Sequence, residues 1–174
     1  MEKNIALATE NTVSGRNQSA YMLEAAFDYL RAAKVLWLQE NLKRVAMVNA
    51  AIAIEIMLKS FIAQPVENER GGTVGEQYEI TGKRLHSLVE LAGEIDSEIY
   101  CKLNFGIYEG FFDKYKELFI EARYPYEPGS RVGFNDEPID VGIAIFKAIM
   151  KWYKETGNSD PWVLTYPEVV GGQL

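Results

Sequence analysis

Two charged side chains interrupt an apolar stretch between residues 45 and 62. Glu55 and Lys59 lie four residues apart, so on a helix they share one face, in the acidic-then-basic order that favours an ion pair. A buried charge is costly unless it is paired. The two residues therefore form either a simple ion pair within the helix or part of a polar pocket. Asn49 lies roughly 100° around the same helix, so it could line such a pocket only from the side.

The single histidine and one arginine offer acid–base and phosphate-binding chemistry. His86, expected in the first turn of a short helix, can act as acid, base or hydrogen-bond donor, or make only a helix-terminal or interhelical hydrogen bond. Arg123 closes a long predicted helix, where it can interact with the helix dipole or grip a phosphate through its guanidinium fork. Tyr124 and Tyr126 beside it can stack on a base.

The residues that several other kinds of metal, phosphate or catalytic site need are absent from the sequence. One histidine excludes a histidine-rich zinc site, and neither the paired Glu-x-x-His of di-iron bundles, a P-loop nor a G-x-S-x-G is present. Cys101 is interpreted as an ordinary packed or surface thiol. Four carboxylates repeat every four residues and are interpreted as a solvated helix face rather than a metal site: Glu109, Asp113, Glu117 and Glu121. We expect neither a metal nor a cofactor.

Length and composition indicate one globular domain. The chain has 174 residues, 48% hydrophobic and 25% charged, which suits a single domain over 1–174 with its core at about 19–156. A single cysteine excludes an internal disulfide and fits a reducing compartment, so we expect a cytoplasmic protein. No signal peptide and no membrane-spanning run is recognised, so no membrane partner is expected.

Charge is distributed unevenly along the chain. The formal net charge is −7, and residues 65–130 carry 13 acidic and 7 basic side chains, which gives −6 for that third alone. A broad basic surface for duplex nucleic acid is therefore excluded. A local site for one phosphate or one RNA nucleotide is compatible with this pattern.

Helical spacing of apolar residues dominates the sequence and predicts an all-α fold. We expect a five-helix, mostly antiparallel up-and-down bundle with irregular N- and C-terminal tails. The second helix is apolar nearly all round and should be the central one. Residues 64–82 are expected to form a loop or a lid, or to be disordered. The five helices are expected at about 19–39, 42–63, 83–94, 98–122 and 138–155.

Three segments, in this order, resemble HEPN-type domains. They are residues 49–60 (NAAIAIEIMLKS), 85–91 (LHSLVEL) and 119–127 (FIEARYPYE). The resemblance spans about residues 20–155. It implies an up-and-down helical bundle that often dimerises, and many such domains belong to prokaryotic toxin–antitoxin or phage-defence systems. A cognate protein such as a nucleotidyltransferase is then an expected partner, together with a second copy of the chain.

Several HEPN-type domains are metal-independent ribonucleases with an Arg-x4–6-His signature, from which this sequence departs. After Arg123, the positions where the histidine would stand hold Pro128, Gly129 and Ser130. A ribonuclease role therefore requires His86 and Arg123 to converge in space, within one chain or across a dimer.

Three functions remain as alternatives. The favoured one is a non-catalytic module that binds a nucleotide, RNA or a cognate protein, because the signature is missing and the middle third is acidic. The second is an endoribonuclease in which Arg123 holds the phosphate, His86 is the general acid or base and Glu55 orients one of them. The third is a purely structural or interaction domain. The expected ligand-binding residues are Asn49, Glu55, Lys59, His86, Arg123, Tyr124 and Glu127.

Overall fold

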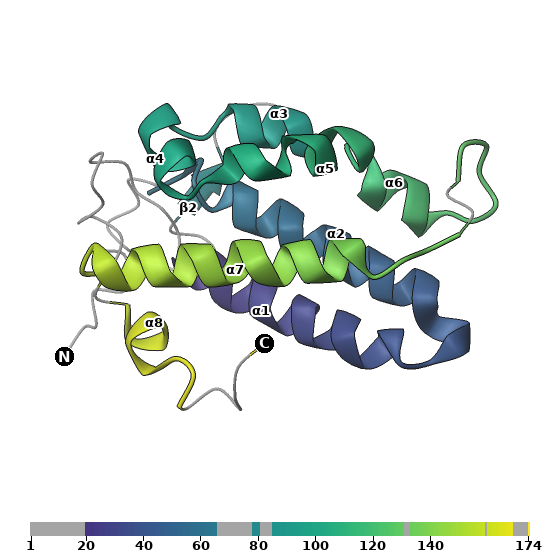
Figure 1. Ribbon diagram of the computed structural model, residues 1–174, viewed down its shortest axis with the longest axis horizontal. Helices are drawn as coiled ribbons and strands as arrows, with labels where there is room; N and C mark the ends of the chain where they lie inside the picture. The colour runs from purple at the N-terminus through teal and green to yellow at the C-terminus, as the bar shows by residue number, and fades with distance from the viewer. Residues whose placement is uncertain (1–19, 66–77, 81–84, 131–132, 159, 169–173) are drawn as a thin grey trace.

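The computed structural model describes residues 20–65, 78–80, 85–130, 133–158, 160–168 and 174. The predicted N-terminal tail therefore lies outside the described residues. Within them, the chain passes back and forth along the long axis of the molecule (Figure 1). The passes are α1 (Ala20–Trp37), α2 (Lys43–Lys59), a segmented third pass and α7 (Glu137–Glu155), with the short 3-10 turn η2 (Glu40–Leu42) between the first two. The predicted all-α fold class is confirmed. No helix of the described part is long and apolar enough to cross a membrane.

The central position predicted for α2 is confirmed. It packs against α1, α6 and α7, and Figure 1 shows it between α1 and the third pass. Eight of its 17 residues are buried, and four of these are alanines, which allow neighbouring helices to approach closely. They are Ala46, Met47, Ala50, Ala51, Ala53, Ile54, Met57 and Leu58.

The predicted C-terminal end of this helix was wrong. The helix ends at Lys59, and residues 63–65 form strand β1 (Ala63–Pro65), which pairs antiparallel with β2 (Tyr78–Ile80) in the register Ala63 to Ile80. The segment 64–82, predicted as a loop or lid, thus contains a short strand pairing. Residues 66–77 and 81–84 of that segment lie outside the described part.

The predicted fourth helix, 98–122, is also wrong, because the third pass consists of four shorter segments. They are α4 (Ser97–Lys102), the 3-10 turn η4 (Phe105–Tyr108), α5 (Glu109–Lys114) and α6 (Leu118–Arg123). The breaks have a packing reason. Ile99, Phe105 and Ala122 are all buried, yet on one straight helix they would point in directions about 100° or more apart. The first break lies at Asn104, whose φ of 55° is left-handed and cannot continue a right-handed helix.

Two side chains at the end of α5 bind the start of α7. The Lys114 ammonium donates to Glu137 Oε2 at 2.5 Å, and the Tyr115 hydroxyl donates to the same oxygen at 2.8 Å. These hydrogen bonds hold the pKa of the Glu137 carboxyl below its usual value, with Lys114 the larger cause. The third pass is thereby linked to the fourth at the end of α5.

Gly142 allows α7 to lie directly on the α1–α2 pair. A Cβ at this position would lie 2.8 Å from Leu30 Cδ2 and 3.4 Å from Ile54 Cγ1. Both neighbours are fully buried, so a side chain here would require the end of the Leu30 side chain to shift within the core.

The predicted irregular C-terminal tail contains a further short helix, α8 (Pro161–Thr165), so that prediction was wrong for these residues. Asp160 caps it, because its carboxylate accepts hydrogen bonds from the backbone N–H groups of Trp162 and Val163. The helix carries two rings onto the main body, where Trp162 and Tyr166 pack against Phe27 with centroid distances of 5.5 and 5.6 Å. With Phe146, these rings form what we call the aromatic cluster, which extends the core beyond residue 156.

Candidate functional site

A partly buried carboxylate, that of Glu55, holds two basic side chains where α2 meets the segment before α3 (Leu88–Gly93). Glu55 Oε1 accepts a hydrogen bond from the Lys59 ammonium at 2.5 Å, so the predicted ion pair within the helix is confirmed. His86 Nδ1 lies 3.0 Å from Oε1 and 3.2 Å from Oε2 of the same carboxylate. The Glu55 and Lys59 side chains are only 13% and 16% exposed, whereas that of His86 is 42% exposed. The cluster therefore has one face that solvent reaches, and this face is the imidazole.

His86 lies before α3 rather than in its first turn, which corrects the prediction. The helix begins at Leu88, and Ser87 is its N-cap, with its hydroxyl accepting from the Glu90 N–H. The sequence carried this signal, because a serine followed three residues later by glutamate is typical of a helix start. The Leu88 N–H donates to the Lys116 carbonyl at 3.0 Å, in the turn between α5 and α6. The backbone thus holds His86 beside α6.

Phe119 on α6 joins His86 to the second predicted catalytic residue. The His86 and Phe119 rings stack with centroids 5.9 Å apart and an interplanar angle of 29°. The Arg123 guanidinium carbon lies 4.7 Å from the Phe119 centroid and 4.1 Å from that of Tyr124. Tyr126 follows, 5.8 Å from Tyr124 between centroids. An imidazole and a guanidinium therefore lie against one shared ring, on a row of side chains that we call the Phe119 stack.

The geometry of His86 suits proton transfer. A carboxylate can only accept, so Nδ1 carries the hydrogen that Glu55 binds, and in the neutral imidazole Nε2 keeps its lone pair. A carboxylate that fixes the tautomer and the ring orientation in this way is a common partner of histidines that act as acid or base. His86 is thereby oriented with its second nitrogen as the acceptor.

The geometry of Arg123 suits an anion. A guanidinium held over aromatic rings can still donate from its N–H groups, whose fork matches the oxygens of a phosphate. Within the part of the chain that the structure describes, Arg123 makes no ion pair. Its residue is exposed at the C-terminal end of α6, so a phosphate can approach it from solvent.

Two predicted ligand-binding residues do not join this group. The Asn49 amide donates to the Val45 carbonyl at 2.8 Å, within its own helix. Glu127 lies in the turn after α6, where its N–H donates to the Tyr124 carbonyl, and its side chain is exposed. Among the described residues neither one forms a hydrogen bond or an ion pair with Glu55, His86 or Arg123. The structure thus brings together Glu55, Lys59 and His86, and places Arg123 and Tyr124 beside them through Phe119.

Phe119 was missed by the sequence analysis, although a signal for it was present. It stands four residues before Arg123, and side chains at that spacing share a helix face. The four carboxylates predicted as one solvated face are instead divided, with Glu109 and Asp113 on α5, Glu117 in the turn and Glu121 on α6. No group of three or more His, Cys, Asp or Glu side chains within the described residues is placed to hold a metal ion.

Comparisons with known proteins give no relative from which a role could be transferred. No protein-family model, no curated protein and no solved structure matches the chain. A functional argument therefore rests on the geometry of this chain alone.

Proposed function

We propose that the chain is a HEPN-like helical module that binds a nucleotide or an unpaired end of RNA on the Phe119 stack. The observation that carries this proposal is the Arg123 guanidinium, which lies over the rings of Phe119 and Tyr124, next to an imidazole that the partly buried Glu55 carboxylate orients. In the bound state, Arg123 donates to the phosphate. Tyr126, which is 78% exposed, stacks on the base.

The negative charge of the surrounding sequence and the small number of binding side chains limit the ligand to a small one. Residues 65–130 carry a net charge of −6, so the surface around the stack offers few further phosphate contacts. A single arginine with flanking tyrosines recognises one phosphate and one or two unstacked bases, not a duplex. The site therefore favours a nucleotide or an RNA end over a longer nucleic acid.

Binding should depend on Arg123 more than on other arginines. We expect Arg123→Ala to weaken binding of a fluorescein-labelled single-stranded hexaribonucleotide by about tenfold or more, because a charge-assisted hydrogen bond to phosphate is lost. The measurement is fluorescence anisotropy at a fixed salt concentration. Arg31→Ala is the matched control, because Arg31 also lies over a phenylalanine, Phe27, but on α1. An equal loss in both variants would mean that only net charge matters, and would reject the site.

The Glu55–His86 hydrogen bond favours a second candidate, metal-independent RNA cleavage. In this reaction His86 Nε2 takes the proton of a ribose 2′-hydroxyl, and the resulting oxyanion attacks the adjacent phosphorus. The bond to the 5′-oxygen breaks, that oxygen receives a proton from solvent, and a 2′,3′-cyclic phosphate remains. Arg123 stabilises the negative charge that builds up on the phosphate oxygens.

RNA cleavage by this chain should be lost when the imidazole of His86 is removed. We expect His86→Ala to lower the rate of cleavage of a single-stranded RNA by at least about 100-fold in the presence of EDTA, the usual contribution of a general base. Arg31→Ala again serves as the control and should keep the rate of the unchanged chain. An undiminished rate in purified His86→Ala protein would assign the activity to a contaminating nuclease, and the binding function alone would remain.

The partners implied by the family resemblance belong to the same proposal. A homodimer would place two Phe119 stacks in one particle, and a cognate protein such as a nucleotidyltransferase would fit a prokaryotic toxin–antitoxin or defence role. Both stay predictions. The oligomeric state can be measured by sedimentation equilibrium of the full chain.

A further inference from the structure

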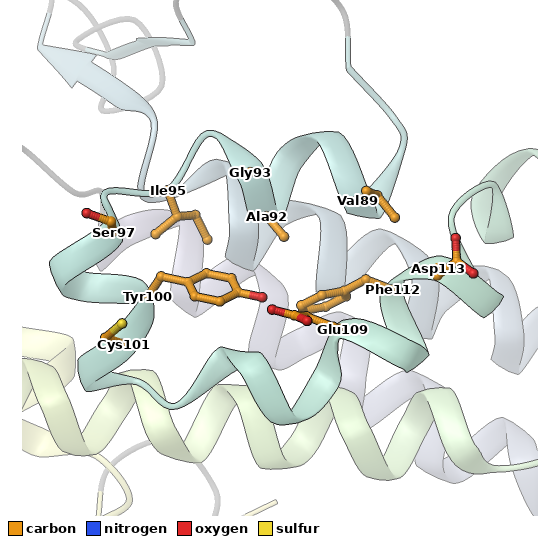
Figure 2. Close-up of a pocket in the computed structure, with 10 residues that line it drawn as sticks. All are labelled: Val89, Ala92, Gly93, Ile95, Ser97, Tyr100, Cys101, Glu109, Phe112 and Asp113. Carbon is orange, nitrogen blue, oxygen red and sulfur yellow. The ribbon is translucent and has the colours of Figure 1, made fainter.

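A second concave surface lies apart from the Phe119 stack. It is an open groove of about 540 Å³ bounded by α3 on one side and by α4 and α5 on the other (Figure 2). Its walls are mainly apolar, and its polar groups are few. The lining residues are Val89, Ala92, Gly93, Ile95, Ser97, Tyr100, Cys101, Glu109, Phe112 and Asp113.

The groove carries two carboxylates and one tyrosine hydroxyl. Glu109 and Asp113 stand one turn apart on α5 and are both exposed. Figure 2 shows the Tyr100 side chain reaching across the groove with its hydroxyl towards Glu109. Partial burial, followed by the charge of Glu109 and a hydrogen bond to it, raises the pKa of Tyr100 above its usual value. Tyr100 therefore stays protonated, with its hydroxyl turned towards the Glu109 carboxylate.

The surroundings of the groove are strongly acidic. Between residues 85 and 113 the sequence holds six carboxylates and a single lysine, Lys102. That lysine is bound to Glu98 at 2.7 Å, so its charge is already compensated. A concave apolar surface surrounded by one sign of charge attracts ligands of the opposite sign.

We propose that this groove binds a small organic cation, an aliphatic or aromatic body that carries one ammonium group. The body packs on Phe112, Ile95 and Val89, the ammonium lies at the Glu109 carboxylate, and Asp113 adds negative charge further along α5. The volume falls within the range of ligand sites, and the Tyr100 ring adds a face on which a cation is stabilised. None of the residues assigned to nucleotide binding takes part, so the two proposals stand or fall separately.

The length of the groove favours a small ligand over a helix of a partner protein. α3, α4 and α5 have six residues each, which corresponds to about 9 Å of helix. A docked amphipathic helix usually presents anchors over two or more turns, about 11 Å or longer. The wall formed by α3 alone is thus shorter than two turns of such a helix.

The test uses the full chain and the probe 4-phenylbutylamine, with 4-phenylbutanol as its uncharged counterpart. We expect calorimetry to detect saturable binding of the amine and at least about tenfold weaker binding of the alcohol, because the charge-assisted hydrogen bonds are missing. The double variant Glu109→Gln/Asp113→Asn should weaken amine binding by about tenfold. Glu90→Gln, which removes a carboxylate of α3 outside the groove, should change it less than twofold.

A second pair of variants tests the place of binding. A Cβ at Gly93 meets no atom within 4 Å, so a side chain can start there, and the bulk of Gly93→Trp should fill the groove and abolish binding. Gly110 is equally unobstructed but does not line the groove, so Gly110→Trp should leave binding intact. Thermal unfolding of each variant shows whether it is folded, and the charge variants keep the test decisive if the tryptophans disturb α3 or α5.

Three results would overturn the proposal. Equal affinity for amine and alcohol would mean a site without charge selection. Unchanged amine binding in both Gly93→Trp and the double charge variant would place the ligand elsewhere. Binding of a basic amphipathic peptide without any binding of the amine would make the groove a protein-docking surface.

Discussion

Glu55→Leu is expected to lower the free energy of unfolding by about 2 kcal/mol, because it leaves the partly buried ammonium of Lys59 without its carboxylate. The Lys59 side chain is only 16% exposed, so water replaces the lost partner poorly. His86 loses its only fixed acceptor among the described residues in the same step. Urea denaturation followed by far-UV circular dichroism measures the change, provided that the transition stays two-state.

The double variant Glu55→Leu/Lys59→Met is the matched control. It replaces both charges by apolar groups of similar length, so we expect it to recover most of the lost stability. It should still bind RNA more weakly if the carboxylate orients His86 for function. A single variant that loses less than about 0.5 kcal/mol would show that the pair is well solvated and that the cluster contributes little to stability.

The second large effect is expected at the aromatic cluster. Phe27→Ala should destabilise the protein by about 3–5 kcal/mol, the usual cost of removing a buried phenylalanine. Phe27 is 2% exposed and contacts rings from α7, from α8 and from Tyr166, the residue that follows α8. Thermal and urea unfolding of the variant measure this loss.

Two control variants accompany Phe27→Ala. One changes the same residue, and the other changes an exposed ring on the same helix. Phe27→Leu fills most of the space and should cost about 1.5 kcal/mol. Tyr21→Ala alters a ring on α1 that is 46% exposed, and should change stability by no more than about 0.5 kcal/mol. A loss below about 1 kcal/mol for Phe27→Ala would contradict the packing of α8 on the body of the protein.

The long helices were predictable because their own sequences carry the whole signal. In α1, Leu23, Phe27 and Leu30 repeat at spacings of three and four, and all three are buried. In α7, Pro138 near the start and Gly157 after the end marked the boundaries, and Gly157 indeed has a positive φ of 75°. The spacing of apolar residues and the residues that start or end a helix are enough to predict helices of this length.

The segmented third pass could not be predicted in the same way. Its apolar residues fit a helical spacing locally, and Gly106 and Gly110 alone do not tell a break from a close approach. The break at Asn104 follows from the need to bury Phe105 together with Ile99, which depends on the neighbouring helices. α8 was missed for a different reason, because the helix that the Asp160–Pro161 signal starts has only five residues in all.

The contacts of the candidate site show the same difference between what local sequence predicts and what depends on the tertiary fold. The contact of Glu55 with Lys59 follows from a spacing of four residues, whereas its contact with His86 spans 31 residues and needs the tertiary fold. The groove between α3 and α5 depends on the turns of the third pass, so the sequence pattern contained no trace of it.

The segmentation of the third pass also bears on the order of folding. A helix of six residues does not persist alone in water, because nucleation outweighs the few hydrogen bonds that it gains. By contrast, α1 and α2 have 18 and 17 residues and are joined by a short connection, so their contacts close small loops. We therefore expect the α1–α2 hairpin to form the folding nucleus, with α4, α5 and α6 condensing on it as a template.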